Sequence, residues 1–266
     1  YYYMGFNASI DHRWIDQKNT ASLLYRNIEK RYSLWVPSVS RNFYKEDFNH
    51  YRINSYVYAN TNPAVPSVDQ LAPIIDTSNR YNTVVGNPLL QVGRNMSVNY
   101  NFNIDRANQK AKSGYGFSVN GSYTATHNAV ADSTWYDASG KSIHYLLNMN
   151  GSNSFNLGGD LHFSTKFKTK YQFQTRYTPT FNISNSPGYI NGVLSSSHNK
   201  TLSNQLTASF IIIDKFNTTL GENITTSKNR QAGAMNLSPS ITNYTTSIDA
   251  TYSITKKWNI SSNFNY

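Results

Sequence analysis

Long runs of alternating apolar and polar residues are the feature that most restricts how this chain can fold. Between residues 97 and 105, every second residue is apolar, namely Val98, Tyr100, Phe102 and Ile104. Successive side chains of a β-strand point to opposite faces of the sheet, so this segment has one apolar and one polar face as a strand. The pattern therefore predicts a strand with one face in an apolar environment.

The same alternation recurs along the whole chain and predicts an all-β protein of about eleven strands, most of them longer than the roughly 9–11 residues that a tilted strand needs to cross a bilayer. The segment 50–60 alternates less cleanly, but β-branched and aromatic residues dominate it, as is typical of strands. The predicted strands span residues 1–15, 32–45, 50–60, 95–106, 114–127, 154–165, 169–184, 200–213, 216–228, 238–253 and 257–266.

The connections between these strands fall into two classes that alternate strictly along the chain. The short class, often basic, comprises residues 45–49, 106–113, 165–168, 214–215 and 255–257. The long class, mostly rich in Gly, Pro, Asn and Ser, comprises residues 16–31, 60–94, 127–152, 185–200 and 228–238. An antiparallel up-and-down sheet places alternate connections at opposite ends. Short turns at one end and long loops at the other are the plan of outer-membrane barrels.

A soluble β-sandwich or β-solenoid is the competing interpretation, because its strands alternate too. Three features favour a membrane barrel. The strands are long, where strands of globular proteins usually have about 5–6 residues. The polar face carries amides and hydroxyls rather than charges, and charged residues make up only 14% of the chain. Aromatic residues mark the ends of the apolar face, as expected at bilayer interfaces; they include Trp14, Tyr115, Tyr171, Tyr252 and Trp258.

Several classes of protein are excluded by composition. The chain has no cysteine, which excludes a disulfide framework, a thiolate nucleophile and a Cys-ligated metal centre. The run from Phe210 to Ile213 is the best apolar stretch, far below the roughly 18 residues of a transmembrane helix. Residues 1–5 show no basic segment leading into an apolar one, so no signal peptide is expected, and the pattern starts as if cut from a longer chain. The many aromatic residues argue against disorder.

Side chains that could support enzymatic or metal chemistry form no recognisable set. The six histidines show no i, i+4 spacing of a helical metal site. Asp132 and Asp137 flank an aromatic pair in a long loop, where solvated acids are commoner than a calcium site or an acid pair. No phosphate loop, nucleophile elbow or dinucleotide fingerprint occurs. We therefore expect no enzyme activity, no metal and no cofactor.

The net charge of +10 does not lead us to expect nucleic-acid binding, because the lysines gather at or beside the predicted short turns. This distribution favours solvation of one rim and attraction to anionic lipid headgroups over a nucleic-acid surface. The lysines concerned are Lys110, Lys112, Lys166, Lys168, Lys170, Lys215, Lys256 and Lys257.

The long connections carry the residues that we expect to bind a ligand: Tyr81, Asn87, Trp135, Tyr136 and Tyr145. They combine flat aromatic faces with an amide, which suits a polar nutrient such as a glycan, a peptide or a metal chelate. The competing interpretation is that these aromatic rings pack loop against loop or lie at the membrane interface.

Four elements between Tyr32 and Tyr100 follow one another in the order of a known family. Tyr32 to Val39 reads Tyr-Ser-Leu-Trp-Val-Pro-Ser-Val, and Tyr51 to Pro63 reads as a strand closed by proline. Pro66 to Pro73 reads Pro-Ser-Val-Asp-Gln-Leu-Ala-Pro, and Gly86 to Leu90 reads Gly-Asn-Pro-Leu-Leu. Together they resemble the β-barrel domain of TonB-dependent receptors and transporters, in the large-barrel family with an N-terminal carboxypeptidase-like regulatory domain.

The resemblance implies an outer-membrane barrel of about 22 strands, of which residues 1–266 form a single segment with no second domain. Strand parity agrees, because a bacterial barrel has an even number of strands and this chain predicts an odd number. We expect the C-terminal half of the barrel, with the plug domain absent from this chain.

The resemblance also implies a Gram-negative outer-membrane location and active nutrient uptake. The implied partners are outer-membrane lipid and the TonB energy-transducing complex, which acts through the plug; the resemblance also leaves room for a surface lipoprotein. Two alternatives stay open at this point: a passive porin-like channel, and a secreted β-rich adhesin or binding module.

Overall fold

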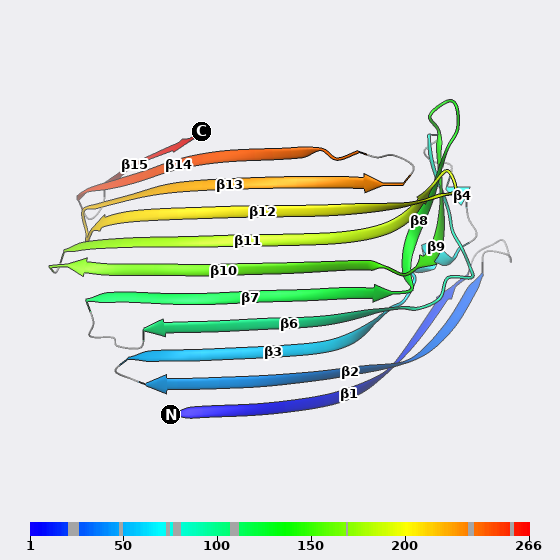
Figure 1. Ribbon diagram of the computed structural model, residues 1–266, viewed down its shortest axis with the longest axis horizontal. Coiled ribbons are helices and arrows are strands. Elements are labelled where there is room, and N and C mark those ends of the chain that lie inside the picture. The colour runs from blue at the N-terminus through cyan, green and yellow to red at the C-terminus, as the bar shows by residue number, and fades with distance from the viewer. Residues whose placement is uncertain are drawn as a thin grey trace.

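The computed structural model describes residues 1–20, 27–47, 50–72, 75–76, 81–106, 112–168, 170–233, 237–255 and 258–266. In this part of the chain, eleven long strands form the main sheet (Figure 1). They are, in spatial order, β1 (Tyr2–Asn19), β2 (Ile28–Asp47), β3 (Tyr51–Ala64), β6 (Gly93–Arg106), β7 (Ser113–His127), β10 (Ser152–Phe167), β11 (Tyr171–Ile190), β12 (Val193–Ile212), β13 (Phe216–Ala232), β14 (Ser240–Thr255) and β15 (Trp258–Asn265).

Every neighbouring pair in the main sheet is antiparallel, and the spatial order follows the order along the chain. The predicted all-β, antiparallel, up-and-down fold is therefore confirmed, and the eleven predicted strands match the eleven main strands one to one. Residues 169 and 257, which begin two of the predicted strands, lie outside the described residues. β1 and β15 form the two edges, so a closed barrel of about 22 strands stays a prediction.

The prediction of a long loop over residues 185–200 is wrong. β11 continues to Ile190 and β12 begins at Val193, so only Asn191 and Gly192 connect them. Both have positive φ, 50° and 77°, as the tight hairpin turn that matches strand twist requires. Pro187 suggested a loop, but β10 pairs with β11 only as far as Asn185. Beyond that point β11 is free of β10, so a proline there interrupts no ladder with that strand.

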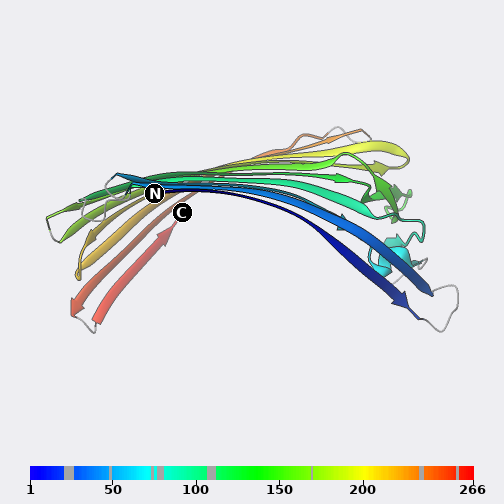
Figure 2. The same ribbon diagram turned by 90° about the horizontal axis from the view of Figure 1, so that it is seen from below.

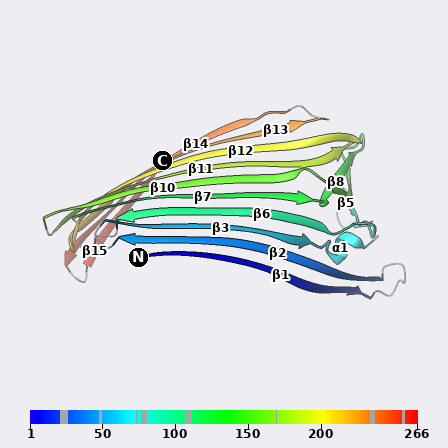
Figure 3. The same ribbon diagram turned by 60° about the horizontal axis from the view of Figure 1, so that its bottom comes forward.

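The predicted loops 60–94 and 127–152 also contain regular structure. They hold α1 (Val68–Leu71), β4 (Ile75–Asp76), β5 (Asn82–Val85), β8 (Ala129–Tyr136) and β9 (Ser142–Met149). We call the four strands the loop-end sheet; within it, β5 and β9 are parallel, and β8 and β9 form an antiparallel hairpin. Figures 1 and 3 show these elements gathered at the end of the main sheet where β1 ends and β2 begins.

The main sheet is curved like part of a barrel wall (Figure 2), and the side chains on its two faces differ in kind. One face carries large apolar side chains that remain exposed along the whole sheet, for example Phe6 at 69% and Trp14 at 74%. The opposite face carries mostly Asn, Ser, Thr and Gln. Gln17 on that polar face donates from Nε2 to the carbonyl of Pro66 (2.9 Å), just before α1. Since α1 lies under the arch in Figure 2, the polar face is concave and the apolar face is convex.

A small buried core lies at the loop end. It consists of Ile28, Leu71, Ala72 and Leu90, with Leu146 and two valines packed against it. α1 begins with a capping box, in which Gln70 N donates to Ser67 Oγ (3.3 Å) and Ser67 N donates to Gln70 Oε1 (2.9 Å). Pro73, the last residue of the motif that includes α1, lies outside the described residues. The helical part of the described chain contains no segment long and apolar enough to span a bilayer.

The opposite end of the main sheet, which we call the turn end, carries the lysines that the sequence placed there. Lys112, Lys166, Lys168, Lys170 and Lys215 flank its tight connections, while Lys110, Lys256 and Lys257 lie outside the described residues. Some charged side chains lie on the convex face itself. Arg41 lies among apolar residues of β2 and β3, and Glu222 accepts a hydrogen bond from Thr246 Oγ1 (3.0 Å) between β13 and β14.

Candidate functional site

The structure brings all five predicted ligand-binding residues into or beside the loop-end sheet. Trp135 and Tyr136 lie on β8 and Tyr145 lies on β9. Tyr81 comes just before β5, where its carbonyl accepts from Ser142 N (2.8 Å). Asn87 follows β5 and reaches β9, because its Nδ2 donates to the carbonyl of Leu146 (2.9 Å).

The aromatic residues of the β8–β9 hairpin do not all face the same way. Trp135 pairs with Ile143, and Ser133 pairs with Tyr145, so Trp135 and Tyr145 are diagonal neighbours on one face. Tyr136 is next to Trp135 in the strand and therefore points to the opposite face. With Tyr81, these rings are between 43% and 73% exposed, so each presents a flat surface to solvent.

Asn87 has a structural role that the sequence did not indicate. Besides its bond to Leu146, its Oδ1 accepts from Leu89 N (2.9 Å), and its backbone N donates to the carbonyl of Gln70 (2.7 Å). The preceding Gly86 lies against the backbone of Ala72 so closely that a Cβ atom would overlap with its carbonyl. The Gly-Asn-Pro element thus joins β9 to α1, and the Asn87 amide is already engaged within the protein.

Asp137 organises the turn between β8 and β9. Its Oδ1 accepts from Ser139 Oγ (2.7 Å), Ser139 N (2.8 Å) and Lys141 N (2.9 Å). The side-chain hydrogen bond from Ser139, followed by the backbone bond from Lys141, lowers the pKa of the Asp137 carboxyl. Asp137 is therefore a turn-forming residue. Asp132, which the sequence pairs with it, instead lies beside His144, with 3.9 Å between Oδ2 and Nδ1.

A pocket of about 410 Å³ lies between the hairpin and the loop ends of β11 to β13. The β8 strand reaches β11 through a short parallel pairing of Ser133 with Tyr189. Ser195, which is buried, donates to the carbonyl of Ala232 (3.0 Å) and accepts from Gln231 Nε2 (2.7 Å). Polar groups from four separate strands therefore converge where the loop-end sheet meets the concave face.

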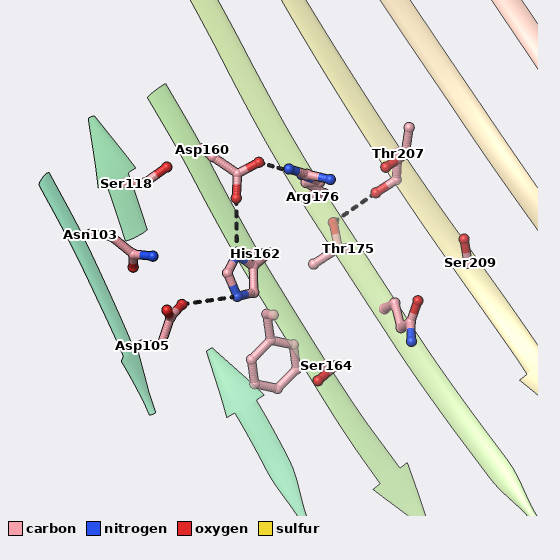
Figure 4. Close-up of a pocket in the computed structure, with 12 residues that line it drawn as sticks. Asn103, Asp105, Ser118, Asp160, His162, Ser164, Thr175, Arg176, Thr207 and Ser209 are labelled. Atoms are coloured by element: carbon pink, nitrogen blue, oxygen red, sulfur yellow. Dashed lines mark hydrogen bonds and ion pairs between the residues drawn. The ribbon is translucent and has the colours of Figure 1, made fainter. Parts of the chain in front are cut away.

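The concave face carries a second candidate site, a row of charged residues that crosses the main sheet near its turn end (Figure 4). We call it the charged row: Arg52 of β3, Asp105 of β6, Asp160 and His162 of β10, and Arg176 of β11. The strand register aligns Arg52 with Asp105, and His162 with Arg176, and it places Gly116 of β7 between Asp105 and His162.

Basic and acidic side chains alternate along the charged row. Arg52 Nη2 lies 3.5 Å from Asp105 Oδ2, and His162 Nε2 lies 3.6 Å from Asp105 Oδ1. On its other side, His162 Nδ1 lies 2.9 Å from Asp160 Oδ1, and Arg176 Nε donates to Asp160 Oδ2. The row thus links β3, β6, β10 and β11 through side chains as well as through the backbone ladder.

Gly116 makes the contact between Asp105 and His162 possible. A Cβ atom at this position would overlap with Asp105 Oδ1 and with the His162 ring. The missing side chain on β7 therefore lets two residues of non-adjacent strands meet across it. This is a requirement for close approach, rather than for an unusual backbone conformation.

The charged row forms one wall of a polar pocket of about 600 Å³. Figure 4 shows hydroxyl and amide side chains around the charges, including Ser118, Thr207 and Ser209. Further along the concave face, Tyr56 and Tyr58 lie parallel, with ring centroids 6.3 Å apart and planes at 8°. They pair in register with Asn101 and Asn99 of β6. This surface can contact a polar solute through hydroxyls, amides and aromatic faces.

Sequence reasoning missed both the charged row and the pocket beside the hairpin. In the sequence, His162 is a histidine without a helical partner, and Arg52 is one residue of a predicted strand. The alternation pattern does place both on the polar face. Their meeting depends on register across strands that include two long connections, from β3 to β6 and from β7 to β10, and no short sequence motif encodes that register.

No family model and no curated protein matches this chain. Among solved structures, the chain is similar to one described as a TodX deltaS2S3 mutant monoaromatic hydrocarbon channel. The alignment has a TM-score of 0.36 and 10% sequence identity, and it covers 100% of this chain and 73% of that chain. The description of the fold therefore rests on the strand order and register given above.

Proposed function

We propose that this chain is part of the wall of a Gram-negative outer-membrane β-barrel, of the TonB-dependent receptor and transporter type, that takes up a polar nutrient. The exposed apolar convex face is the observation that carries the proposal. Soluble monomers rarely expose apolar patches larger than a few hundred Å², whereas here such residues run from β1 to β15. Hydrocarbon is the solvent that suits this face.

A bilayer also explains why the sheet should continue beyond β1 and β15. Backbone groups at an open edge find no hydrogen-bond partner in hydrocarbon, so a sheet can span a membrane only when it closes. The concave face would then line the lumen, where its amides and hydroxyls contact water and solute. The long strands, with 20 residues in β2, β11 and β12, allow the wall to extend above the membrane.

The loop-end sheet is the proposed place of substrate capture. Trp135 and Tyr145 present adjacent rings on one face of the hairpin, and the polar pocket lies against its other face, where Asp132, Thr134 and Leu146 line it. A glycan, a peptide or a metal chelate combines flat or apolar surface with polar groups, and such a site suits all three. The resemblance of the Gly86 to Leu90 segment to TonB-dependent receptors supports the finer assignment.

In this proposal the chain performs no covalent chemistry. Substrate binds at the loop end, a plug domain outside this chain closes the lumen at rest, and the TonB complex pulls on that plug. The residues of this chain bind the solute and line its path. Outer-membrane lipid, the TonB complex and a surface lipoprotein are the proposed partners, and we propose no enzyme activity and no nucleic-acid partner.

The test uses the full-length protein in its native host. We expect it to fractionate with the outer membrane, to migrate differently on gels with and without boiling, and to support uptake that stops when TonB is removed. A protein found in the culture medium would point to the secreted adhesin instead. Uptake that continues without TonB would point to a passive channel.

A further inference from the structure

A groove on the convex face combines apolar walls with Arg41 in its lining, and Lys45 lies beyond Phe43 on the same strand. We propose that this groove binds one anionic phospholipid, with the lipid phosphate at Arg41 and Lys45 and an acyl chain in the groove. The inference rests on the proposed function, because it assumes that the convex face meets a bilayer. The proposed function requires only that the convex face contacts the bilayer, and this inference assigns one lipid to a defined site on that face.

Arg41 is a charged residue surrounded by apolar residues on the convex face. It lies on β2 between Val39 and Phe43 on the same side of the strand, and it pairs in register with Phe6 and Val57. A charged side chain facing lipid costs about 2–4 kcal/mol at the bilayer midplane and about 0–1 kcal/mol near the interface. In the described part of the chain, Arg41 forms no ion pair. A charge in this setting suggests a functional partner.

The Arg41 side chain leans toward the turn end. Its Nη2 donates to Met4 Sδ (3.5 Å), although Met4 pairs in register with Phe43, two residues nearer that end. A long cationic side chain that lies along apolar surface and extends its charge toward the interface is snorkelling. The guanidinium is therefore directed to the level where lipid headgroups lie, and it keeps most of its donors free for a phosphate.

Lys45 supplies a second cation on the same strand, nearer the turn end. It lies four residues beyond Arg41 on the same face, about 13 Å along the strand at roughly 3.3 Å per residue. Its Nζ lies 5.5 Å from the centroid of the Tyr51 ring, which holds it at the rim of the apolar surface. Arg106 lies nearby in sequence register with Tyr51, but it already donates to the carbonyl of Ser113 (3.1 Å). Arg41 and Lys45 are therefore the cations that can receive a lipid phosphate.

The groove beside Arg41 has the shape that an acyl chain requires. Ser55 of β3 lies in register between Phe43 of β2 and Phe102 of β6. A small side chain between two large ones leaves a depression, and its volume is about 510 Å³. Arg41, Phe43, Ile53, Ser55, Val57, Tyr100 and Phe102 line it. Arg41 thus lies beside an apolar groove, and its guanidinium can contact a headgroup whose acyl chain lies in that groove.

Charge decides which lipid fits best. Arg41 and Lys45 bring two cations against one neighbouring carboxylate, that of Asp47, which favours a headgroup that bears phosphate and no ammonium group, such as phosphatidylglycerol. A zwitterionic phosphatidylcholine headgroup would bring its own cation close to Arg41 and Lys45. Each basic residue near an anionic surface contributes about 1 kcal/mol, which corresponds to about a fivefold change in affinity.

The test measures lipid binding to the full-length protein, purified from outer membranes in a non-ionic detergent. Native mass spectrometry counts the lipids retained during titration with phosphatidylglycerol or phosphatidylcholine. We expect preferential retention of phosphatidylglycerol, about a fivefold loss in Arg41→Gln, and a larger loss in Arg41→Gln/Lys45→Gln. Ser55→Phe fills the groove without changing charge, and we expect it to weaken binding of long-chain but not of dihexanoyl phosphatidylglycerol.

Arg13→Gln is the matched control, because Arg13 lies on the concave face of β1 and should not contact lipid. Equal binding of phosphatidylglycerol by the wild type and by Arg41→Gln would overturn the inference, as would an equal loss in Arg13→Gln or equal retention of phosphatidylcholine. The same preparations report on the proposed function through their outer-membrane origin and heat-modifiable mobility. A protein without outer-membrane origin and heat-modifiable mobility would contradict the proposed function. A protein that has both but binds the two lipids equally would contradict only the lipid site.

Discussion

On β10, Leu157 and Leu161 point to the convex face, while Asn156, Asp160 and His162 point to the concave face. The two sets share one backbone, yet they interact with their surroundings in different ways. The convex residues remain exposed and have few specific partners in the described part of the chain. The concave residues form defined contacts across neighbouring strands, such as that from Asn156 Nδ2 to Ser122 Oγ of β7 (3.1 Å).

This difference predicts which substitutions each face tolerates. The convex face needs only apolar character, because hydrocarbon is non-directional, so most apolar substitutions should be neutral there. The concave face needs particular side chains in particular register, because hydrogen bonds and ion pairs depend on distance and angle. Charge should therefore be harmful on the convex face and tolerated on the concave face, whereas added bulk should have the opposite effect.

The largest effect is expected from placing a charge on the convex face. Leu206→Arg puts a guanidinium near the middle of the apolar stretch of β12, at a cost of about 2–4 kcal/mol. The neighbouring Gln205→Arg puts the same group on the concave face, where about 0.5 kcal/mol or less is expected. Urea titration of refolding into lipid vesicles, read by heat-modifiable mobility, measures both. Equal destabilisation by the two variants would mean that the faces do not meet lipid and water as proposed.

The next largest effect is expected from adding bulk within the charged row. Gly116→Ala introduces a Cβ atom that overlaps with Asp105 and His162, and overpacking of this kind costs about 1–3 kcal/mol. On the convex face of the same strand, a Cβ atom at Gly121 would lie at ordinary contact distance, 3.7 Å from Leu157 Cδ1. Gly121→Ala should therefore have little effect in the same titration. Comparable losses in both variants would contradict the role assigned to Gly116.

A third prediction compares structural and exposed residues at the loop end. Asn87→Ala removes the donor to the Leu146 carbonyl and the acceptor for Leu89 N, and leaving such groups without a partner costs about 1–3 kcal/mol. Hydrogen exchange should then accelerate in β9 and α1, with the main sheet unchanged. Tyr136→Ala, which truncates an exposed ring, serves as the control. Unchanged protection in Asn87→Ala would favour the binding role predicted from sequence.

The smallest effect is expected at Asp137, in the β8–β9 turn. Its pKa is lowered in the folded protein by the hydrogen bonds from Ser139 and Lys141. Its contribution to the turn is therefore present above the unfolded pKa of about 3.9 and is lost as the pH falls through the folded value. Exchange protection at Ser139 and Lys141, corrected for intrinsic rates, should decrease at acidic pH. Asp137→Asn should lack this dependence, and an identical pH profile in the variant would assign the effect to another group.

The loop end shows how far the sequence could be read. The Gly86 to Leu90 element was recognised as a motif, and Asn87 was assigned to ligand binding. The structure places Asn87 between α1 and β9, where it holds the loop-end sheet together. Trp135 and Tyr145 were assigned from residue type alone, and the structure shows that they share a face while Tyr136 does not. Residue type indicated what these side chains can do, but not which of them lie together.

The sequence by itself determined the eleven main strands, their order and the face to which each of their side chains points. These features follow from a period of two residues, which is local and needs no knowledge of distant partners. Only the tertiary structure decided the strand register, and with it the charged row from Arg52 to Arg176 and the groove beside Arg41. Register is a relation between strands that long connections separate, and it is set by the packing of the whole sheet. For that reason the alternation pattern revealed two faces, while the sites on them became visible only after folding.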